Sequence, residues 1–224
     1  MKQKLKYILV GLALLLTPSM VFAKQMTKAN VIVPADETID GNFYAAGEQV
    51  VIDGTVLGDV IVAGGMVQIN GTVAGDVIAA GGQIRITGPV QGDVRVAGGD
   101  VILESVVGKN LTLMAGNAYI SPNAAIGLSA LVMAGNVDMH GLIERDLTAL
   151  VGALKLNGTV NGNVDAKVGE PDQFYVQSQA LIGGDLKYKS PSQANVLSGA
   201  TIEGSVDYDT MRSDKDSPKA ESIL

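Results

Sequence analysis

The chain has 224 residues, of which 47% are hydrophobic but only 4% are aromatic, and it contains 28 glycines and no tryptophan. A rounded core normally uses large aromatic rings, whereas aliphatic residues with frequent glycine suit narrow, regular packing between strands. The formal net charge of −7 argues against binding to nucleic acid or to anionic membrane surfaces. The absence of cysteine excludes disulfides and thiolate chemistry.

Residues 1–23 have the pattern of a signal peptide for secretion. Three lysines precede an apolar run at residues 8–16, Pro18 follows, and Val21-Phe22-Ala23 supplies small residues for cleavage. We therefore predict export to the periplasm, the cell envelope or the exterior. Cleavage would leave 13 basic residues against 23 acidic ones, because three of the 16 Lys and Arg lie in this segment. The alternative is an uncleaved membrane anchor, since residues 7–23 are nearly long enough to span a bilayer.

An internal repeat dominates the rest of the chain. The octapeptide GDVIVAGG at residues 58–65 returns as GDVIAAGG at 75–82 and as GDVRVAGG at 92–99, each time 17 residues later. Self-similarity of this extent outranks any local prediction of secondary structure. We predict one repeat domain over residues 38–209. The apolar residue after the Gly-Asp pair marks its ten copies: Phe43, Val60, Val77, Val94, Leu111, Ala130, Leu147, Val164, Leu186 and Val206.

Each repeat predicts three short strands and three corners. The apolar residues alternate with a period of two and fall into three groups, which in one repeat are Val60 and Val62, Val67 and Ile69, and Val73. Residues that tolerate the positive φ of a tight corner separate these groups, namely Gly64-Gly65, Asn70-Gly71 and Gly75-Asp76.

The fixed interval between like residues favours parallel stacking of the coils, about 4.8 Å apart. A sheet of hairpins is the main alternative, but its repeat is shorter and alternates in direction. Parallel crossovers are overwhelmingly right-handed. We therefore predict an all-β fold, a right-handed parallel β-helix, as a triangular solenoid of about ten coils of roughly 17 residues. Its length would be about 45–50 Å.

The segments that flank the regular coils are predicted separately. Residues 24–37 form a leader, in which NVIVP at 30–34 predicts one further strand that covers the first coil. Irregular stretches at 167–179 and 188–197, each with a proline, predict loops at corners. Residues 210–224 lack periodicity and are charged, so we predict a disordered polar tail.

The coils at residues 58–73, 75–90 and 92–107, with Gly-rich corners and almost no aromatic residues, resemble those of the bactofilins. These are bacterial polymer-forming cytoskeletal proteins, and the resemblance spans residues 38–208. It implies a right-handed triangular β-helix that polymerises end to end without nucleotide, through the apolar faces of its terminal coils. It also implies a scaffold role in cell shape and envelope organisation. Typical members are cytosolic, whereas this chain begins with an export signal, so we predict an exported variant.

One short polar residue recurs at the same corner of every coil. A file of carboxylates about 4.8 Å apart could bind divalent cations. However, stacked carboxylates repel, and the Asn and Ser members relieve this repulsion. We therefore expect the row to cap corners by bonding nearby backbone amides, and we predict no metal and no cofactor. The row is Asp59, Asp76, Asp93, Asn110, Ser129, Asp146, Asn163, Asp185 and Ser205.

A carbohydrate-binding or carbohydrate-degrading exported β-helix is the alternative function. A glycan-cleaving site needs two or three acids that converge on one groove, whereas the acids here are spread one per coil. The best candidate is the longest loop, with Glu170, Asp172, Phe174 and Tyr175, although an ordinary surface loop is the favoured interpretation. The single histidine, His140, stands alone at a corner. We predict no catalytic residues and no enzymatic activity.

The functional prediction rests on the two terminal coils of the solenoid. A β-helix leaves unpaired backbone groups and an open apolar core at each end, and monomeric solenoids cover these ends with polar caps. We see no amphipathic capping helix in the sequence. We therefore predict a homopolymer assembled end to end, with cell-envelope or cell-wall components as further partners and no nucleic acid. The expected end contacts are Val31, Val33, Ile202, Val206 and Tyr208.

Overall fold

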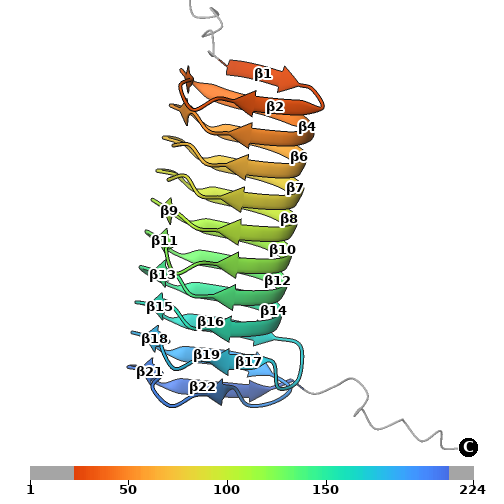
Figure 1. The fold of residues 1–224 in the computed structure, drawn as a ribbon. Coiled ribbons are helices and arrows are strands. Elements are labelled where there is room, and N and C mark those ends of the chain that lie inside the picture. The colour runs from red at the N-terminus through yellow and green to blue at the C-terminus, as the bar shows by residue number, and fades with distance from the viewer. Residues whose placement is uncertain (1–22, 212–224) are drawn as a thin grey trace, which may run out of the picture.

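The computed structural model describes residues 23–211, and over this range the chain is an all-β parallel solenoid without helices. About 11 turns of about 17 residues stack into a rod (Figure 1). At a spacing of about 4.8 Å per turn the rod is roughly 50 Å long. The predicted signal peptide lies outside the described residues except for Ala23, and so does the predicted tail beyond residue 211.

The largest sheet contains 14 strands, and one strand from each turn follows the next along the rod in the order β1-β4-β6-β7-β8-β10-β12-β14-β16-β19-β22. In that order their bounds are Ala23–Thr27, Asn42–Ile52, Val60–Ile69, Val77–Ile86, Val94–Leu103, Leu111–Ile120, Ala130–Met139, Leu147–Leu156, Val164–Val168, Leu186–Ser190 and Val206–Thr210. Where the long strand is interrupted, its second half is a separate strand: β2 (Asn30–Val33), β17 (Phe174–Val176) or β20 (Asn195–Val196).

Two-residue strands close the third side of the rod. Six of them form a second sheet in the order β21-β18-β15-β13-β11-β9, and β3 pairs with β5. Single parallel bridges join the successive valines at 56, 73, 90 and 107. The bounds are β3 Thr38–Ile39, β5 Thr55–Val56, β9 Val106–Val107, β11 Ala125–Ile126, β13 Leu142–Ile143, β15 Thr159–Val160, β18 Leu181–Ile182 and β21 Thr201–Ile202.

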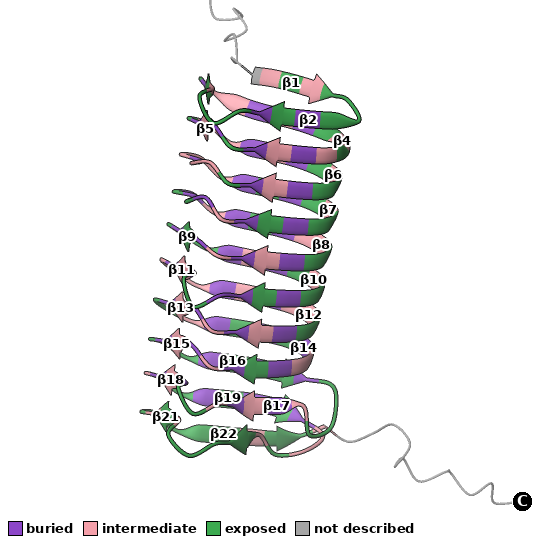
Figure 2. Ribbon diagram, viewed as in Figure 1, coloured by how far each residue is buried: buried purple, intermediate pink, exposed green. Residues whose placement is uncertain are grey.

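Each ten-residue strand bends at its middle, because the inward alternation stops and restarts there. In β6, Val60 and Val62 are buried before the bend and Val67 and Ile69 after it, with Gly64-Gly65 between them. The same burial pattern repeats turn after turn, as bands along the rod (Figure 2). The predicted inward groups are confirmed, including Val73 on the third side.

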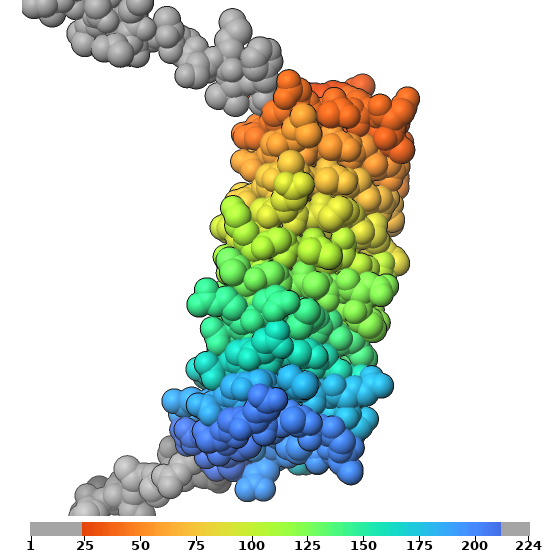
Figure 3. Space-filling model, turned by 90° about the vertical axis from the view of Figure 1, so that its left-hand side faces the viewer, coloured from red at the N-terminus to blue at the C-terminus, as the bar shows by residue number. Residues whose placement is uncertain are grey.

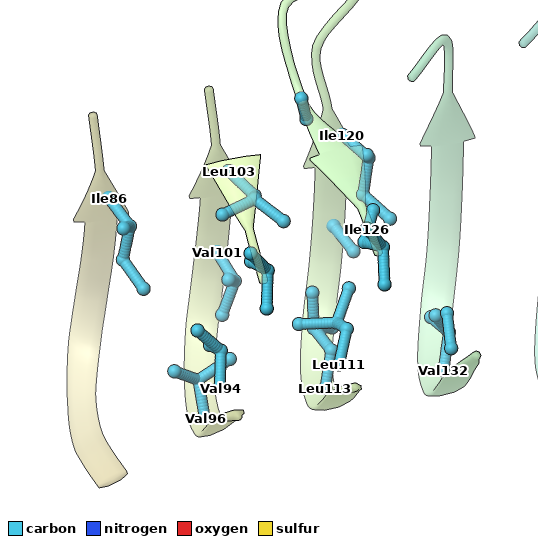
Figure 4. Close-up of a cluster of buried hydrophobic side chains, with 14 of the residues drawn as sticks. Ile86, Val94, Val96, Val101, Leu103, Leu111, Leu113, Ile120, Ile126 and Val132 are labelled. Carbon is cyan, nitrogen blue, oxygen red and sulfur yellow. The ribbon is translucent and has the colours of Figure 1, made fainter. Parts of the chain in front are cut away.

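The core is one narrow column of stacked aliphatic side chains. Consecutive segments of the sequence occupy consecutive layers of the rod (Figure 3). In Figure 4, the side chains of β8 and β10 point into the interior, where those of neighbouring turns meet. Phe43 and Phe174 are the largest fully buried side chains. Strands bound the core on three sides, so its cross-section is narrow and leaves little room for aromatic rings. This explains the low aromatic content.

Insertions leave the register of the core intact. Leu111 pairs with Ala130 across 19 residues, and Val164 pairs with Leu186 across 22. The additional residues leave the rod at corners, so inward positions still stack on inward positions. The loop predicted at 167–179 is shorter in the structure, because β16 continues to Val168 and β17 begins at Phe174.

The leader is a turn of the solenoid and not a single covering strand. β1 and β2 pair in parallel with the two halves of β4, and β3 pairs with β5. Residues 23–39 thus follow the path of the next turn, which raises the predicted ten turns to about 11. The repeat is hard to see there because Lys24 and Met26 stand in register with Phe43 and Ala45.

Glycine is needed at the corners for a different reason from the one the sequence suggested. Among the described residues, positive φ occurs only at Gly41, Gly199 and Asp172. A Cβ atom on Gly71 would instead collide with the carbonyl oxygen of Gly54, one turn earlier. At this corner the stacked turns approach each other too closely for a Cβ atom at Gly71 unless the backbone shifts, and glycine permits that approach.

Candidate assembly ends

The last turn of the rod exposes residues of a kind that earlier turns bury. Val206 is 54% exposed, whereas Leu186, its partner one turn earlier, is fully buried. Val196 is 49% exposed, and its partner Val176 is fully buried. In Figure 2 the bands of buried residues stop before β22. The C-terminal end is therefore an open cross-section of the apolar core.

A column of aromatic rings runs to this end. Tyr208 stacks on Tyr188 with 5.0 Å between ring centroids, and Tyr188 meets Phe174 edge-on at 5.2 Å. Tyr188 is buried, whereas Tyr208 lies in the last described turn and is only half-buried. Aromatic pairs in these geometries contribute beyond their buried area. The column thus anchors the last turn and presents one ring at the end of the rod.

The same turn also ends both major sheets. β22 is the last strand along the larger sheet, and β21 is the last strand of the smaller one. Their outer edges have no strand partner within the described part of the chain. Unpaired N–H and C=O groups on such an edge are a template for pairing with another chain.

An ion pair closes the N-terminal end. Lys24 stands in register with Phe43, an inward position, and its ammonium group binds the carboxylate of Glu37 near the start of β3. The pair therefore joins two sides of the first turn. Val31 and Val33 in this turn are fully buried.

The five predicted end contacts divide between the two ends. The burial of Val31 and Val33 corrects the expectation that they form the N-terminal contact, because a fully buried side chain offers no surface to a second molecule. Ile202, Val206 and Tyr208 lie together in the last turn, where Val206 is exposed and the other two are half-buried.

Sequence reasoning missed two of the most exposed apolar residues of the C-terminal end. Val196 and Leu197 are 49% and 46% exposed. They lie within the stretch predicted as a loop, but the structure places β20 there and pairs it with β17. The sequence did contain a signal for a strand here, because these two adjacent apolar residues stand in an otherwise polar stretch.

Comparison of the chain with family models, with curated proteins and with solved structures found no match. The chain is therefore described by its architecture, a β-solenoid of about 11 turns.

The polar residue at the corner of each turn bonds to the turn that follows it. Oδ1 of Asp59 accepts a hydrogen bond from the backbone N–H of Asp76 (2.9 Å), and Oδ1 of Asp76 accepts one from the N–H of Asp93 (2.8 Å). The row begins one turn earlier than predicted, at Asn42, and runs to Ser205. The expected capping role is confirmed, with each amide supplied by the neighbouring turn.

These hydrogen bonds determine the electrostatics of the row. The backbone N–H of Asn110 lowers the pKa of Asp93 below its ordinary value, and the backbone N–H of Ser205 lowers the pKa of Asp185 in the same way. Arg95 further bridges Asp76 and Asp93, at 3.2 and 2.7 Å. Between residues 23 and 211, no three His, Asp or Glu side chains are grouped so as to hold a metal ion.

The loop considered for carbohydrate binding does not assemble as a site. Phe174 is 2% exposed and belongs to the core, so it has no free face for a sugar ring. Glu170 and Asp172 are exposed at the corner, and Tyr175 points outward in register with Lys155.

A groove of about 690 Å³ lies elsewhere, along the second halves of the strands from β6 to β14. A row of polar side chains follows it: the side-chain amide of Asn117 donates to Asp100, and that of Asn136 donates to Asn117, both at 2.9 Å. Tyr119 lies in the same groove, with its ring centroid 5.7 Å from that of His140. His140 is therefore not isolated.

Proposed function

We propose that this protein is a structural, polymer-forming β-helix that assembles end to end without nucleotide. The observation that carries the proposal is the last turn, where Val206 is 54% exposed in register with a fully buried Leu186. Full burial of one such aliphatic side chain stabilises a contact by about 1.5–3 kcal/mol. Several side chains and an unpaired strand edge lie together on this end, so it favours contact with a second rod.

The two ends support this assembly in different ways. The C-terminal end offers apolar side chains together with the free edges of β21 and β22. The N-terminal end offers the outer edge of β1, which has no strand partner among the described residues, and the Lys24–Glu37 ion pair lies in the same turn. Because monomeric solenoids normally cover their terminal turns, two accessible edges favour a homopolymer. The resemblance to bactofilins supports the same function.

We place this polymer in the cell envelope as a scaffold, with envelope or cell-wall components as partners. This part of the proposal rests on the signal-peptide pattern of residues 1–23, which lies outside the described structure except for Ala23. No helix between residues 23 and 211 is long and apolar enough to cross a membrane.

The test is negative-stain electron microscopy and light scattering of the purified protein at several concentrations, without nucleotide. We expect filaments, and we expect Val206→Asp to abolish them, because a carboxylate at the contact would be desolvated without a partner. Val106→Asp is the matched control, since Val106 is 49% exposed but lies in the middle of the rod. A wild-type protein that stays monomeric at high concentration contradicts the proposal.

We infer carbohydrate binding in the 690 Å³ groove as a second candidate function. The groove combines side-chain amides, a carboxylate and the ring of Tyr119, and such groups can bond hydroxyls and pack against an apolar sugar face. Titration of the purified protein with soluble glycans separates the two functions. Binding that is lost in Tyr119→Ala favours this candidate, and no binding at millimolar glycan removes it.

A further inference from the structure

The outward residues on the first side of the rod form a largely apolar face over seven consecutive turns, interrupted by Arg95 and two threonines, which we call the flat face. It has two columns, each with one residue per turn. The first column is Tyr44, Ile61, Ile78, Arg95, Thr112, Leu131 and Thr148, and the second is Ala46, Ala63, Ala80, Ala97, Met114, Met133 and Leu150. Ile78, Met114 and Leu150 are each 45–46% exposed. A contiguous apolar patch of this kind indicates an interaction surface.

Along the second column of the flat face the side chains change from small to large just after the central turn. The second column begins with four alanines and ends with Met114, Met133 and Leu150, so it is hollow in its first half and raised in its second half. A shallow cavity lies over three of these alanines, Ala63, Ala80 and Ala97, and Ile61, Ile78 and Met114 also line it. The turn of Arg95 and Ala97 lies at the centre, with three turns on either side.

We propose that two copies of this chain pack flat face against flat face, with antiparallel rods, about a two-fold axis at the turn of Arg95 and Ala97. This operation keeps each column opposite itself and reverses the order of the turns. Each hollow then meets a raised residue of the partner subunit. The second-column pairs are Ala46 with Leu150, Ala63 with Met133, Ala80 with Met114, and Ala97 with itself.

The first column is compatible with the same axis. The axis places Tyr44 opposite Thr148 and Ile78 opposite Thr112 of the partner subunit, so a large residue again meets a smaller one. Ile61 meets Leu131 of the partner subunit, and these two residues are of similar size. A two-fold contact must be self-complementary in this sense. A parallel arrangement would instead place the two columns opposite each other turn by turn, and Met114 would then meet Thr112 without filling the alanine hollow.

Charge distribution favours the same arrangement. Arg95 lies on the axis, but it is held toward the corner by Asp76 and Asp93, which neutralise it. Beyond Leu150 the outward residues become charged, with Asp165 and Lys167 in the next turn. In the antiparallel pair this turn meets Gln25 and Thr27 of the partner subunit, and later turns extend past the described residues of the partner. The apolar residues thus stop where the overlap stops.

The contact is of modest size. Seven strands about 4.8 Å apart and four residues wide cover roughly 30 by 13 Å on each copy. At about 800 Å² for the two copies together the contact is smaller than most specific interfaces, so we expect a weak, transient dimer with a dissociation constant on the order of 100 micromolar. The pairing does not depend on end-to-end assembly. In a filament, it would join two filaments side by side and gain strength from repetition.

Sedimentation equilibrium of the protein carrying Val206→Asp tests the pairing while end-to-end contacts are blocked. We expect dimers of the rod. Ala63→Met fills the hollow and Met133→Ala removes the residue that enters it, so each should weaken dimerisation on the order of tenfold. Together they exchange the large and small residues, and affinity should return to within about threefold of the starting protein. The three residue changes lie at outward positions or at the exposed end of the rod, and thermal unfolding confirms that each variant is folded.

Single variants that dimerise like the starting protein would overturn the proposal, as would a double variant no better than the weaker single one. Cross-linking gives an independent readout, since the chain has no cysteine of its own. With a short bis-maleimide, Ala97→Cys should give a covalent dimer because the axis brings the two copies of this position together. Gln68→Cys, on another side of the rod, should not. Equal yields at both positions exclude the proposed axis.

Discussion

The corner residues join each turn to the next by a hydrogen bond that several side chains can accept. Oδ1 of Asp59 and Oδ1 of Asn110 both bind the backbone N–H of the following corner residue, and Oγ of Ser129 does so at 3.4 Å. The requirement at this position is a short acceptor, and charge is optional. At Asp93 and Asp185, however, the bond lowers the pKa of a carboxyl group and so makes stability depend on pH.

We predict that Asp185→Asn flattens the loss of stability in acid. The N–H of Ser205 lowers the pKa of Asp185 in the folded state. A lowered pKa means that the contribution is complete above the unfolded carboxyl value, about 3.9, and is lost as the pH falls through the folded value. The amide keeps the acceptor but cannot titrate. Urea unfolding from pH 2 to pH 7 measures this, with Asp165→Asn outside the row as control. An unchanged acid slope in Asp185→Asn would contradict the prediction.

At the scale of the strand and its corner, close stacking of turns determines which residues fit. We predict that Gly71→Ala destabilises the rod by about 1–3 kcal/mol, because its Cβ would collide with the backbone of Gly54 and the stacked corners would have to separate. Gly169→Ala should be nearly neutral, since the nearest atom to its Cβ is 3.6 Å away. Urea unfolding of the two variants measures the difference, and equal stabilities would show that the corners can relax.

The elements that the sequence predicted well are those that every turn repeats. Val60, Val62, Val67, Ile69 and Val73 are inward in the structure because stacking requires the same residue class at the same place in each turn. The corner row was predictable for the same reason. A repeat in the sequence therefore identifies the positions at which every turn has the same structural requirement.

The ends and the outer surfaces could not be predicted in this way, because they are constrained once or not at all. Lys24 stands in register with Phe43 at an inward position, where its ammonium group binds Glu37, and no other described turn repeats this pair. Ala63 recurs in the octapeptide as Ala80 and Ala97, but later turns have Met133 or another large residue at this outward position, and no requirement of the core indicates that change of size.

At the scale of the whole molecule, stability is distributed among neighbouring turns. Each turn pairs with the turn before it and the turn after it, and the core is one continuous column. Such a rod behaves approximately as a sum of turn and interface contributions. The two terminal turns therefore each lack one interface, and the proposed end contacts would supply it.

This arrangement predicts how far along the rod a destabilising substitution in the core lowers stability. Val77 is fully buried in β7, so Val77→Asp places an unpaired charge in the core and should lower the free energy of unfolding by about 3–5 kcal/mol. Gln68→Asp, at an outward position of β6, should change it by less than about 0.5 kcal/mol. Hydrogen exchange followed by mass spectrometry should show the greatest loss of protection in β6, β7 and β8, with β14 retaining most of its own. A uniform loss along the rod would instead mean that all the turns unfold as one cooperative unit, and nearest-neighbour contributions would then not describe its stability.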